Sequence, residues 1–421
     1  MSRLIVATIV SAQLICQVAM QLLVVRLAGV CQATDTYLAA QAVPLAVAAV
    51  LVSALQSAWL PRFSDFTDGA QWTEQIASAQ AQAILLSGGV ALAIGLIAPL
   101  WLPFLYPSFS STQYSQAFLY TALLLLGLIL TTNSSVLLVA LRVRGQHITA
   151  ELAALAGALV AVIATYFAVA EFGILGAVVV QVLRTGLLVA LQLWLLDWPR
   201  PAWMAGLRDR ETWRLMRPLI LSGGVFKFGP VIDRFIAGLT PTGTLTIFVL
   251  AQTLVLPLVT LLEQVICVPA LTRISRSIRS GYNRHPARLF LGELIQIIIL
   301  VGIVAILGLL VFSYGVNIVQ VVLKLDNDSA HLLLVCSLVF LAFVASTAAG
   351  RLVTATFYAG GDSRSTALVG IVNFVFSVAA KLLLFQHMGI VGLAAGVAAF
   401  PCLNVAVLLL LQSRHHAKKK N

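Results

Sequence analysis

Residues 147–196 read HITAELAALAGALVAVIATYFAVAEFGILGAVVVQVLRTGLLVALQLWLL. This stretch contains two apolar runs, 148–170 and 173–196, and each is long enough for a membrane-spanning helix, which needs about 20 residues. Gly173 stands at their junction, where a tight turn requires a residue without a side chain. The stretch therefore predicts two membrane helices joined by a glycine turn.

The same pattern recurs in the second half of the chain. A shift of 216 residues lays 145–192 onto 361–408 without a gap and pairs glycines at three positions, Gly145 with Gly361, Gly173 with Gly389 and Gly176 with Gly392. Transporters are commonly built from duplicated halves around a central site. We therefore expect two parallel repeats of six helices each, since an even number of spans preserves orientation.

The composition agrees with a chain embedded in a membrane along its whole length. Of 421 residues, 60% are hydrophobic and 10% are charged, whereas soluble proteins have about 25% charged residues. The mean hydropathy is +1.01, which excludes a large soluble catalytic or DNA-binding domain.

Apolar segments predict an all-α protein with twelve membrane-spanning helices, at residues 4–27, 36–60, 76–106, 114–141, 148–170, 173–196, 216–239, 243–271, 287–320, 329–357, 366–386 and 389–412. These helices are expected to form two lobes around a central cavity. The expected organisation is an N-terminal six-helix lobe at 1–196, a cytoplasmic linker at 197–215, a C-terminal six-helix lobe at 216–412 and a basic tail at 413–421.

The basic residues predict the orientation of the chain. The net charge of +11 could suggest a nucleic-acid partner, but the charges gather at the ends of the apolar segments. If both termini are cytoplasmic, 19 of the 26 Lys and Arg residues fall on the cytoplasmic side, as the positive-inside rule requires. We therefore expect a multi-pass protein with both termini cytoplasmic and no nucleic-acid partner.

Known catalytic and nucleotide-binding motifs are missing. The sequence has no H-E-x-x-H, G-x-S-x-G or Walker A motif, and its five cysteines lack metal-binding spacing. We therefore expect no catalytic residues, no metal, no cofactor and no bound nucleotide. Any transport should be driven by an ion gradient or by the membrane potential.

Ionisable residues at membrane depth are costly and are candidates for function. Arg184 and Lys227 lie near the middle of predicted spans, and Arg234 follows Lys227 by seven residues. On one helix this spacing would place Lys227 and Arg234 on one face, about 10.5 Å apart along the axis, which suits a diphosphate. A structural ion pair between Asp233 and Arg234 is the alternative, and Pro230 is expected to kink the helix.

Other membrane charges have simpler interpretations. Lys381 is expected to reach the interface with its long side chain, as is Arg26. Glu263 and Glu293 could bind a coupling cation or a proton, and a structural pairing with a neighbouring arginine is the alternative. Glu151 is expected to be a first-turn acid at a helix N-terminus.

Several segments resemble the MurJ/MviN lipid II flippases of the multidrug/oligosaccharidyl-lipid/polysaccharide (MOP) exporter superfamily. The resemblance rests on Arg26–Gly29 followed by Ala33–Tyr37, on Arg217–Pro218 with Val231–Ala237, and on Phe357–Thr366. It covers nearly the whole chain in order.

The resemblance implies a flippase of peptidoglycan biosynthesis and cell shape in the bacterial cytoplasmic membrane, acting by alternating access. It implies that Asp35 matches a functional acid, with Arg26 and Asp233 as gating or ion-pairing partners, and that Arg351 joins Lys227, Arg234 and Arg184 in binding the substrate. Leu14, Met20 and Ala48 stand where the family has cavity arginines. The expected substrate is a polyprenyl-diphosphate-linked saccharide, either lipid II or a related lipid-linked glycan.

Two alternatives remain open from the sequence. A multidrug exporter of the same superfamily would share the twelve-helix plan but needs acids for cationic drugs, whereas this chain offers mainly bases. An integral-membrane glycan polymerase or ligase would need a long external loop with catalytic groups, and the longest outer candidate, 315–330, holds only Lys324, Asp326 and Asp328.

Overall fold

The structure, a computed structural model, describes residues 2–65, 69–263, 267, 316–317, 319–359 and 363–420, with isolated residues between 292 and 306. Within these ranges all regular secondary structure is helical. The chain divides into two compact units, Met1–Thr246 and Ile247–Asn421. The sequence-based division with a linker at 197–215 stays a prediction.

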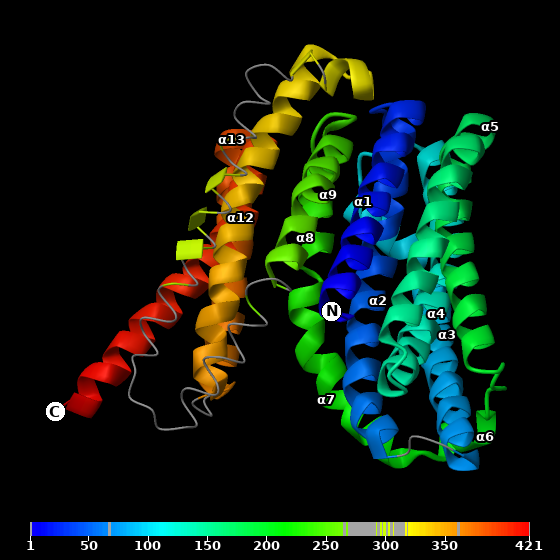
Figure 1. The fold of residues 1–421 in the computed structure, drawn as a ribbon. Coiled ribbons are helices and arrows are strands. Elements are labelled where there is room, and N and C mark those ends of the chain that lie inside the picture. Colours follow the sequence, from blue (N-terminus) through cyan, green and yellow to red (C-terminus); the bar gives the residue numbers. More distant parts are fainter. Residues whose placement is uncertain are drawn as a thin grey trace. The chain divides into compact units, whose positions relative to one another are not determined.

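The first unit is a bundle of helices that lie side by side (Figure 1). It comprises α1 (Ser2–Ala28), α2 (Gln32–Asp65), α3 (Ala70–Leu105), α4 (Ser111–Val143), α5 (His147–Leu195), α6 (Trp203–Arg208), α7 (Arg210–Lys227), α8 (Gly229–Ala237) and the first turn of α9 (Thr244–Leu262). The second unit contains the rest of α9, α12 (Asn327–Ala359) and α13 (Ser363–Lys420).

Glycine breaks confirm the internal repeat. Gly173 interrupts α5 with φ 59° and ψ −142°, and Gly389 interrupts α13 with φ 58° and ψ −139°. Three residues later, an added Cβ would lie 2.1 Å from the Ala168 carbonyl oxygen at Gly176 and 2.0 Å from the Leu384 oxygen at Gly392. Residues 168 and 384 are themselves related by the 216-residue shift, so both turns are built in the same way.

The helix bounds extend this repeat beyond the stretch recognised in the sequence. Adding 216 to the bounds of α4 gives those of α12, and adding 216 to the start of α5 gives the start of α13. Both α4 and α12 begin with a side-chain cap, because Ser110 accepts a hydrogen bond from the Gln113 N–H and Asp326 accepts one from the Ser329 N–H. Hydrogen bonds from Ser329 lower the pKa of Asp326.

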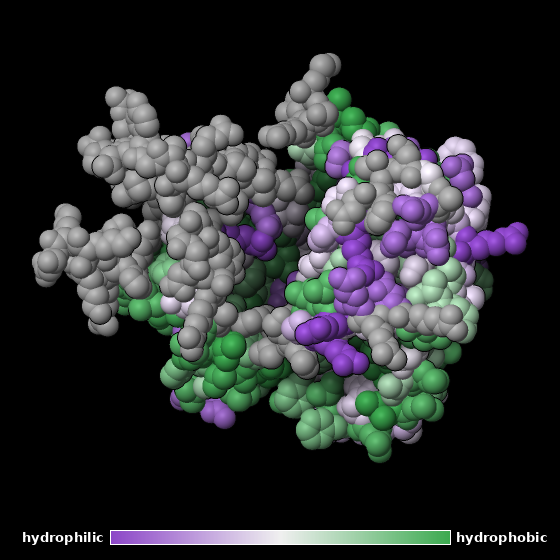
Figure 2. Space-filling view, turned by 90° about the horizontal axis from the view of Figure 1, so that it is seen from below, coloured by the Kyte–Doolittle hydropathy of each residue, from purple (hydrophilic) through white to green (hydrophobic). Residues whose placement is uncertain are grey.

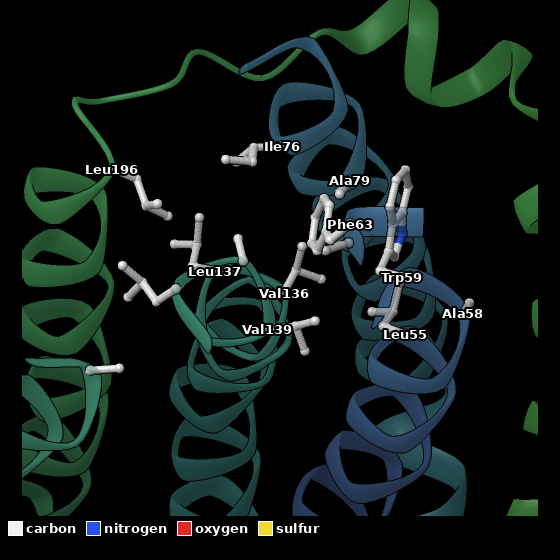
Figure 3. Close-up of a cluster of buried hydrophobic side chains, with 14 of the residues drawn as sticks. Leu55, Ala58, Trp59, Phe63, Ile76, Ala79, Val136, Leu137, Val139 and Leu196 are labelled. Carbon is white, nitrogen blue, oxygen red and sulfur yellow. The ribbon is translucent and has the colours of Figure 1, made fainter. Parts of the chain in front are cut away.

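The largest hydrophobic cluster of the first unit joins α2, α3, α4 and the end of α5 (Figure 3). Trp59 and Phe63 of α2 are fully buried in it and face Val136 and Val139 of α4. Trp72 closes the cluster from α3 with its ring edge toward Phe63. Close packing of such large rings holds this end of the bundle rigid.

Exposed apolar side chains confirm the membrane interpretation. Eight helical segments in the described ranges are long and apolar enough to cross a bilayer. On α3, Leu92, Leu96, Leu100 and Phe104 recur every four residues and are all exposed, so one face of this helix is apolar and unpacked. Such a face is stable against lipid tails and unstable in water.

The predicted span at 216–239 is not one continuous helix. Two helices occupy it, because α7 ends at Lys227 and α8 begins at Gly229 with Pro230 in its first turn. Proline has no N–H to continue the hydrogen-bond ladder of α7, so the helix breaks where the sequence predicted a kink. The predicted span at 287–320 and the end of that at 243–271 lie mostly outside the described residues.

Candidate functional site

Asp35 joins two distant parts of the first unit. Its carboxylate accepts hydrogen bonds from the N–H of Gly243 at 2.5 Å, from the N–H of Thr246 at 2.9 Å and from the Thr246 hydroxyl at 2.6 Å. These donors belong to the start of α9, so the first turn of α2 supplies an N-cap to another helix. An acid at a helix N-terminus is also favoured by the helix dipole.

The surroundings of Asp35 enforce this arrangement. Gly243 has φ +91°, and an added Cβ would lie 2.6 Å from Val30 Cγ1, so only glycine fits between the cap and the loop before α2. Asp35 is buried, with 7% of its surface exposed. Arg26, expected as a pairing partner, is exposed in the last turn of α1 and forms no ion pair with the described residues.

Arg234 and Lys227, expected on one helix face, lie in different helices and in different environments. Lys227 is exposed at the end of α7. Arg234 of α8 is half-buried, donates one hydrogen bond to the Leu38 carbonyl oxygen at 3.0 Å, and has a buried Nε without an acceptor among the described residues. It interacts electrostatically with the buried Asp233 beside it. The expected shared face fails because the helix breaks between the two cations.

A polar network involves the residues of α2 on either side of Leu38. Gln181 of α5 accepts hydrogen bonds from the Tyr37 hydroxyl at 2.8 Å and from the Gln41 amide at 3.0 Å. Gln181 also lines a cavity of about 30 Å³ together with Thr131 and Thr185. That volume holds about one water molecule, so the cavity is too small for a substrate. The hydrogen bonds of Tyr37 and Gln41 with Gln181 nevertheless place polar side chains between α2 and α5 at membrane depth.

Arg184 lies on the same half of α5. It is half-buried and lies near Cys16 of α1. No carboxylate pairs with it in the part of the chain that the structure describes. A guanidinium cannot lose its proton in a protein, so Arg184 brings a positive charge into a membrane-spanning bundle.

Glu151 has a structural role that its sequence position did not reveal. It is buried, and its carboxylate pairs with Arg142 of α4 at 2.8 Å. The Gln13 amide of α1 donates to the Glu151 backbone oxygen at 2.7 Å and to its carboxylate at 3.2 Å. Glu151 thus joins α1, α4 and α5, whereas a first-turn acid alone would face solvent.

In the second unit, Arg351 of α12 forms a salt bridge with Glu263, the residue that follows α9. The two residues were expected in separate roles, Arg351 in substrate binding and Glu263 in ion coupling. Their pairing matches the structural alternative for Glu263. Glu293 lies outside the described residues.

A buried polar row runs along the first half of α13. Asn373, Ser377 and Lys381 are spaced by four residues and are all buried, so they share one face of the helix. Asn373 donates to the Asn404 side chain at 3.3 Å. The expectation that Lys381 reaches the interface is wrong, because its side chain is 5% exposed and packs where Gly396 leaves space for it.

Charged side chains in the described ranges form pairs and not clusters of possible metal ligands. Groups of three or more His, Cys, Asp or Glu residues that could hold a metal are absent from these ranges. Asp35 instead contacts a helix end, Glu263 an arginine and Glu151 an amide. Arg184 and Arg234 are both half-buried cations, and of the two Arg234 has an acid beside it, Asp233.

Comparison with known proteins identifies the family. Residues 24–421 match the family described as lipid II flippase MurJ. The chain belongs to this family. The recognition made from the sequence motifs is therefore confirmed, and MurJ flippases are transporters of the membrane and not catalysts.

Solved structures show the same fold. The chain is similar to a lipid II flippase MurJ in an inward closed conformation, with 14% identity, a TM-score of 0.81, and coverage of 97% of this chain and 86% of that one. It is similar to an inward-facing multidrug resistance MATE transporter of the MOP superfamily, with 17% identity, a TM-score of 0.77, and coverage of 97% and 96%. A eukaryotic MATE transporter, AtDTX14, matches with 16% identity, a TM-score of 0.61, and coverage of 97% and 93%. No curated protein matches the chain.

These likenesses confirm the all-α, two-lobed transporter fold built from six-helix repeats. MurJ and MATE transporters share that fold, so it does not by itself distinguish a lipid-linked glycan from a drug. The substrate class must therefore be inferred from the charge and pairing of the side chains inside the helix bundle.

Proposed function

We propose that this MurJ-family protein moves a polyprenyl-diphosphate-linked saccharide across the bacterial cytoplasmic membrane by alternating access. The observation that carries the proposal is the positive sign of two half-buried side chains in the first unit. Arg184 and Arg234 are half-buried at membrane depth and have no carboxylate salt bridge among the described residues. A diphosphate would supply a negative partner for Arg184 and an acceptor for the Arg234 Nε, which has none among the described residues. Arginine binds phosphate oxygens with two parallel donors.

The same charges argue against a multidrug exporter as the nearest alternative. A cationic drug would be repelled by Arg184 and Arg234, and the effective dielectric constant of a protein interior makes that repulsion much stronger than in water. Asp35, the buried acid of α2, is fully occupied by three donors of α9. It is therefore assigned to holding the start of α9 and not to binding a substrate.

Among the four residues expected to bind substrate, the structure favours two. Arg351 already pairs with Glu263, and Lys227 is exposed at the end of α7. We therefore assign the diphosphate to Arg184 and Arg234. Both residues come from the first unit, as do the Tyr37, Gln41 and Gln181 side chains near them.

The driving force and the orientation are part of the proposal. A substrate with a diphosphate carries negative charge, so an ion gradient or the membrane potential could drive its movement. The positive-inside rule, applied to the basic loops of the sequence, supports a cytoplasmic position for both termini. In this orientation Asp35 and the start of α9 lie on the outer side of the membrane.

Purified protein in vesicles with a fluorescent polyprenyl-diphosphate saccharide tests the proposal. A membrane-impermeant reductant that bleaches only the outer leaflet measures how much of the lipid crosses. We expect wild-type protein to raise the crossing rate, Arg184→Gln and Arg234→Gln to reduce it at least tenfold, and Arg351→Gln to reduce it less. Equal rates for wild type, Arg184→Gln and Arg234→Gln would overturn the assignment.

Complementation then separates the substrates. The family's cavity arginines are replaced by Leu14, Met20 and Ala48, so the chain should rescue a lipid II flippase depletion poorly. Robust rescue at ordinary expression would show that the remaining cations suffice for lipid II.

A further inference from the structure

The segment between α5 and α7 is docked firmly on α3. The N–H of Ala202 donates to the Ala77 carbonyl oxygen at 2.9 Å, and the Gln82 amide donates to the Gly206 carbonyl oxygen at 3.1 Å. At Gly206 an added Cβ would lie 2.9 Å from the Ala81 Cβ and 3.1 Å from the Ser78 carbonyl oxygen. Backbone contact this close holds the short helix α6 in one position.

The opposite side of the segment is apolar and exposed. Trp198, Trp203, Met204 and Leu207 are between 47% and 61% exposed. Trp198 also has φ 53° and follows Asp197 with φ 60°, a left-handed conformation that L side chains adopt only at an energetic cost. The N–H of Trp198 donates to the Leu193 carbonyl oxygen at 2.8 Å and maintains this turn. The fold therefore holds a strained turn that leaves a tryptophan exposed.

The docking position on α3 corresponds to the edge of the bilayer. The helix has 36 residues and is about 54 Å long at 1.5 Å per residue, whereas the hydrocarbon core is about 30 Å thick. If α3 is centred, about 12 Å of it extends beyond the core at each end. Ala77 and Gln82 lie about 10 and 18 Å from its start, so α6 lies at the level where acyl chains meet headgroups.

The charges around the apolar side chains are positive. The acids Asp209 and Glu211 both pair with Arg62 at the end of α2. Arg200, Arg214 and Arg217 are exposed and form no ion pair with any residue that the structure describes. Arg62 holds both acids of the segment, and the four arginines named here outnumber these two acids, so the net charge is positive. Seen from this end, the first unit shows hydrophilic side chains in its middle and hydrophobic ones at its rim (Figure 2).

We propose that Trp198–Arg217 forms an interfacial platform that binds anionic phospholipid headgroups on the side of the membrane where α6 lies. The tryptophans and their apolar neighbours enter the boundary between headgroups and acyl chains, where tryptophan is enriched in membrane proteins. Arg200, Arg214 and Arg217 bind the lipid phosphates. A protein partner would also accept an apolar and basic surface, but the position of α6 at the bilayer edge favours lipid.

Fluorescence quenching by brominated lipids tests the platform in the full chain. The protein is reconstituted in nanodiscs of phosphatidylcholine, with or without phosphatidylglycerol, and without polyprenyl lipids, so that only phospholipid is available. Phosphatidylglycerol brominated near the headgroup should quench the tryptophans more than phosphatidylcholine brominated at the same carbon. The Trp198→Phe/Trp203→Phe variant should lose most of that difference, whereas the control Trp101→Phe at the other end of α3 should retain it.

Charge variants test the lipid preference. The triple change Arg200→Gln, Arg214→Gln and Arg217→Gln should remove the preference for phosphatidylglycerol by at least several-fold, and the corresponding triple lysine variant should keep most of it. Raising the salt concentration to 0.5 M should weaken the preference of the wild type, because screening shortens the reach of surface charges. If the glutamine variant misfolds, the lysine variant and the salt dependence still decide the question.

Some outcomes would overturn the proposal. Equal quenching by the two brominated lipids in the wild type would show that the segment does not select anionic lipid. A preference that survives the triple glutamine change in folded protein would place the anionic site elsewhere. If no lipid brominated near the headgroup quenches the tryptophans, the segment does not contact the lipid interface, and a protein partner becomes the better explanation of its exposed apolar surface.

Discussion

Removing the carboxylate of Asp35 should release the start of α9. Asp35→Ala leaves the N–H groups of Gly243 and Thr246 without their acceptor at a buried position. Each such loss costs about 1–3 kcal/mol, so the contact between α2 and α9 should weaken by roughly 2–6 kcal/mol. At 1.4 kcal/mol per factor of ten, even the lower value raises the detached fraction about 30-fold.

The native Cys31 can report this detachment. It lies one turn before Asp35, is half-buried, and its neighbour Val30 contacts the Gly243 position. With the other four cysteines replaced by serine, the rate at which a membrane-impermeant maleimide labels Cys31 should rise at least tenfold in Asp35→Ala. Thr246→Val removes only the hydroxyl donor, so its rate should lie between those of wild type and Asp35→Ala.

Asp328→Ala provides the matched control, because Asp328 is an exposed acid in the first turn of α12 whose carboxylate forms no hydrogen bond or ion pair among the described residues. Its labelling rate should equal that of the wild type. If Asp35→Ala also labels at the wild-type rate while remaining folded, then the cap does not hold the start of α9 and the reasoning from its hydrogen bonds is refuted.

Three further predictions concern the scaffold. Gly392→Ala should lower the melting temperature and the yield of monodisperse protein in detergent, because its Cβ would overlap a carbonyl oxygen, whereas Gly88→Ala, with nothing within 4 Å, should change neither. Arg142→Gln should cost about 1–3 kcal/mol by leaving the buried Glu151 carboxylate without its cation. Adding Glu151→Gln should recover most of the melting temperature, because no buried charge then remains. Partial burial raises the pKa of Asp209, but hydrogen bonds from Thr212 and Arg62 outweigh it and lower this pKa overall. Asp209 therefore stays ionised between about pH 5 and 8, and hydrogen exchange around α7 should not change in that range. Exchange should increase only as the pH falls below about 4 and Asp209 becomes protonated.

Local features of the sequence were enough to predict the membrane helices and their duplication. Spans are visible because about 20 consecutive apolar residues are needed wherever a helix crosses the bilayer. The turns are visible because Gly173 and Gly389 must adopt a positive φ. The apolar runs and the glycine turns each depend only on residues close together in the sequence. They can therefore be predicted without knowing how the helices pack. Pro230 likewise marked the place where α7 and α8 separate.

Pairing between distant residues was decided by the tertiary structure. Asp35 binds residues 208 and 211 positions away, and Arg351 pairs with Glu263, 88 positions away. Lys381 was expected at the interface but is buried, because the second half of α13 provides Gly396 opposite it. No pattern within one helix specifies which residue of another helix it will meet.

The physical reason is that lipid and protein interior are both apolar. In a soluble helix the polar face identifies the side that meets water, whereas in a membrane helix both the lipid-facing and the packed face are apolar. The sequence by itself therefore determined that this chain folds into membrane helices, how many repeats it has and which family it belongs to. Only the tertiary structure decided which charges are paired, as at Glu263 and Arg351, and which have no carboxylate partner among the described residues, as at Arg184.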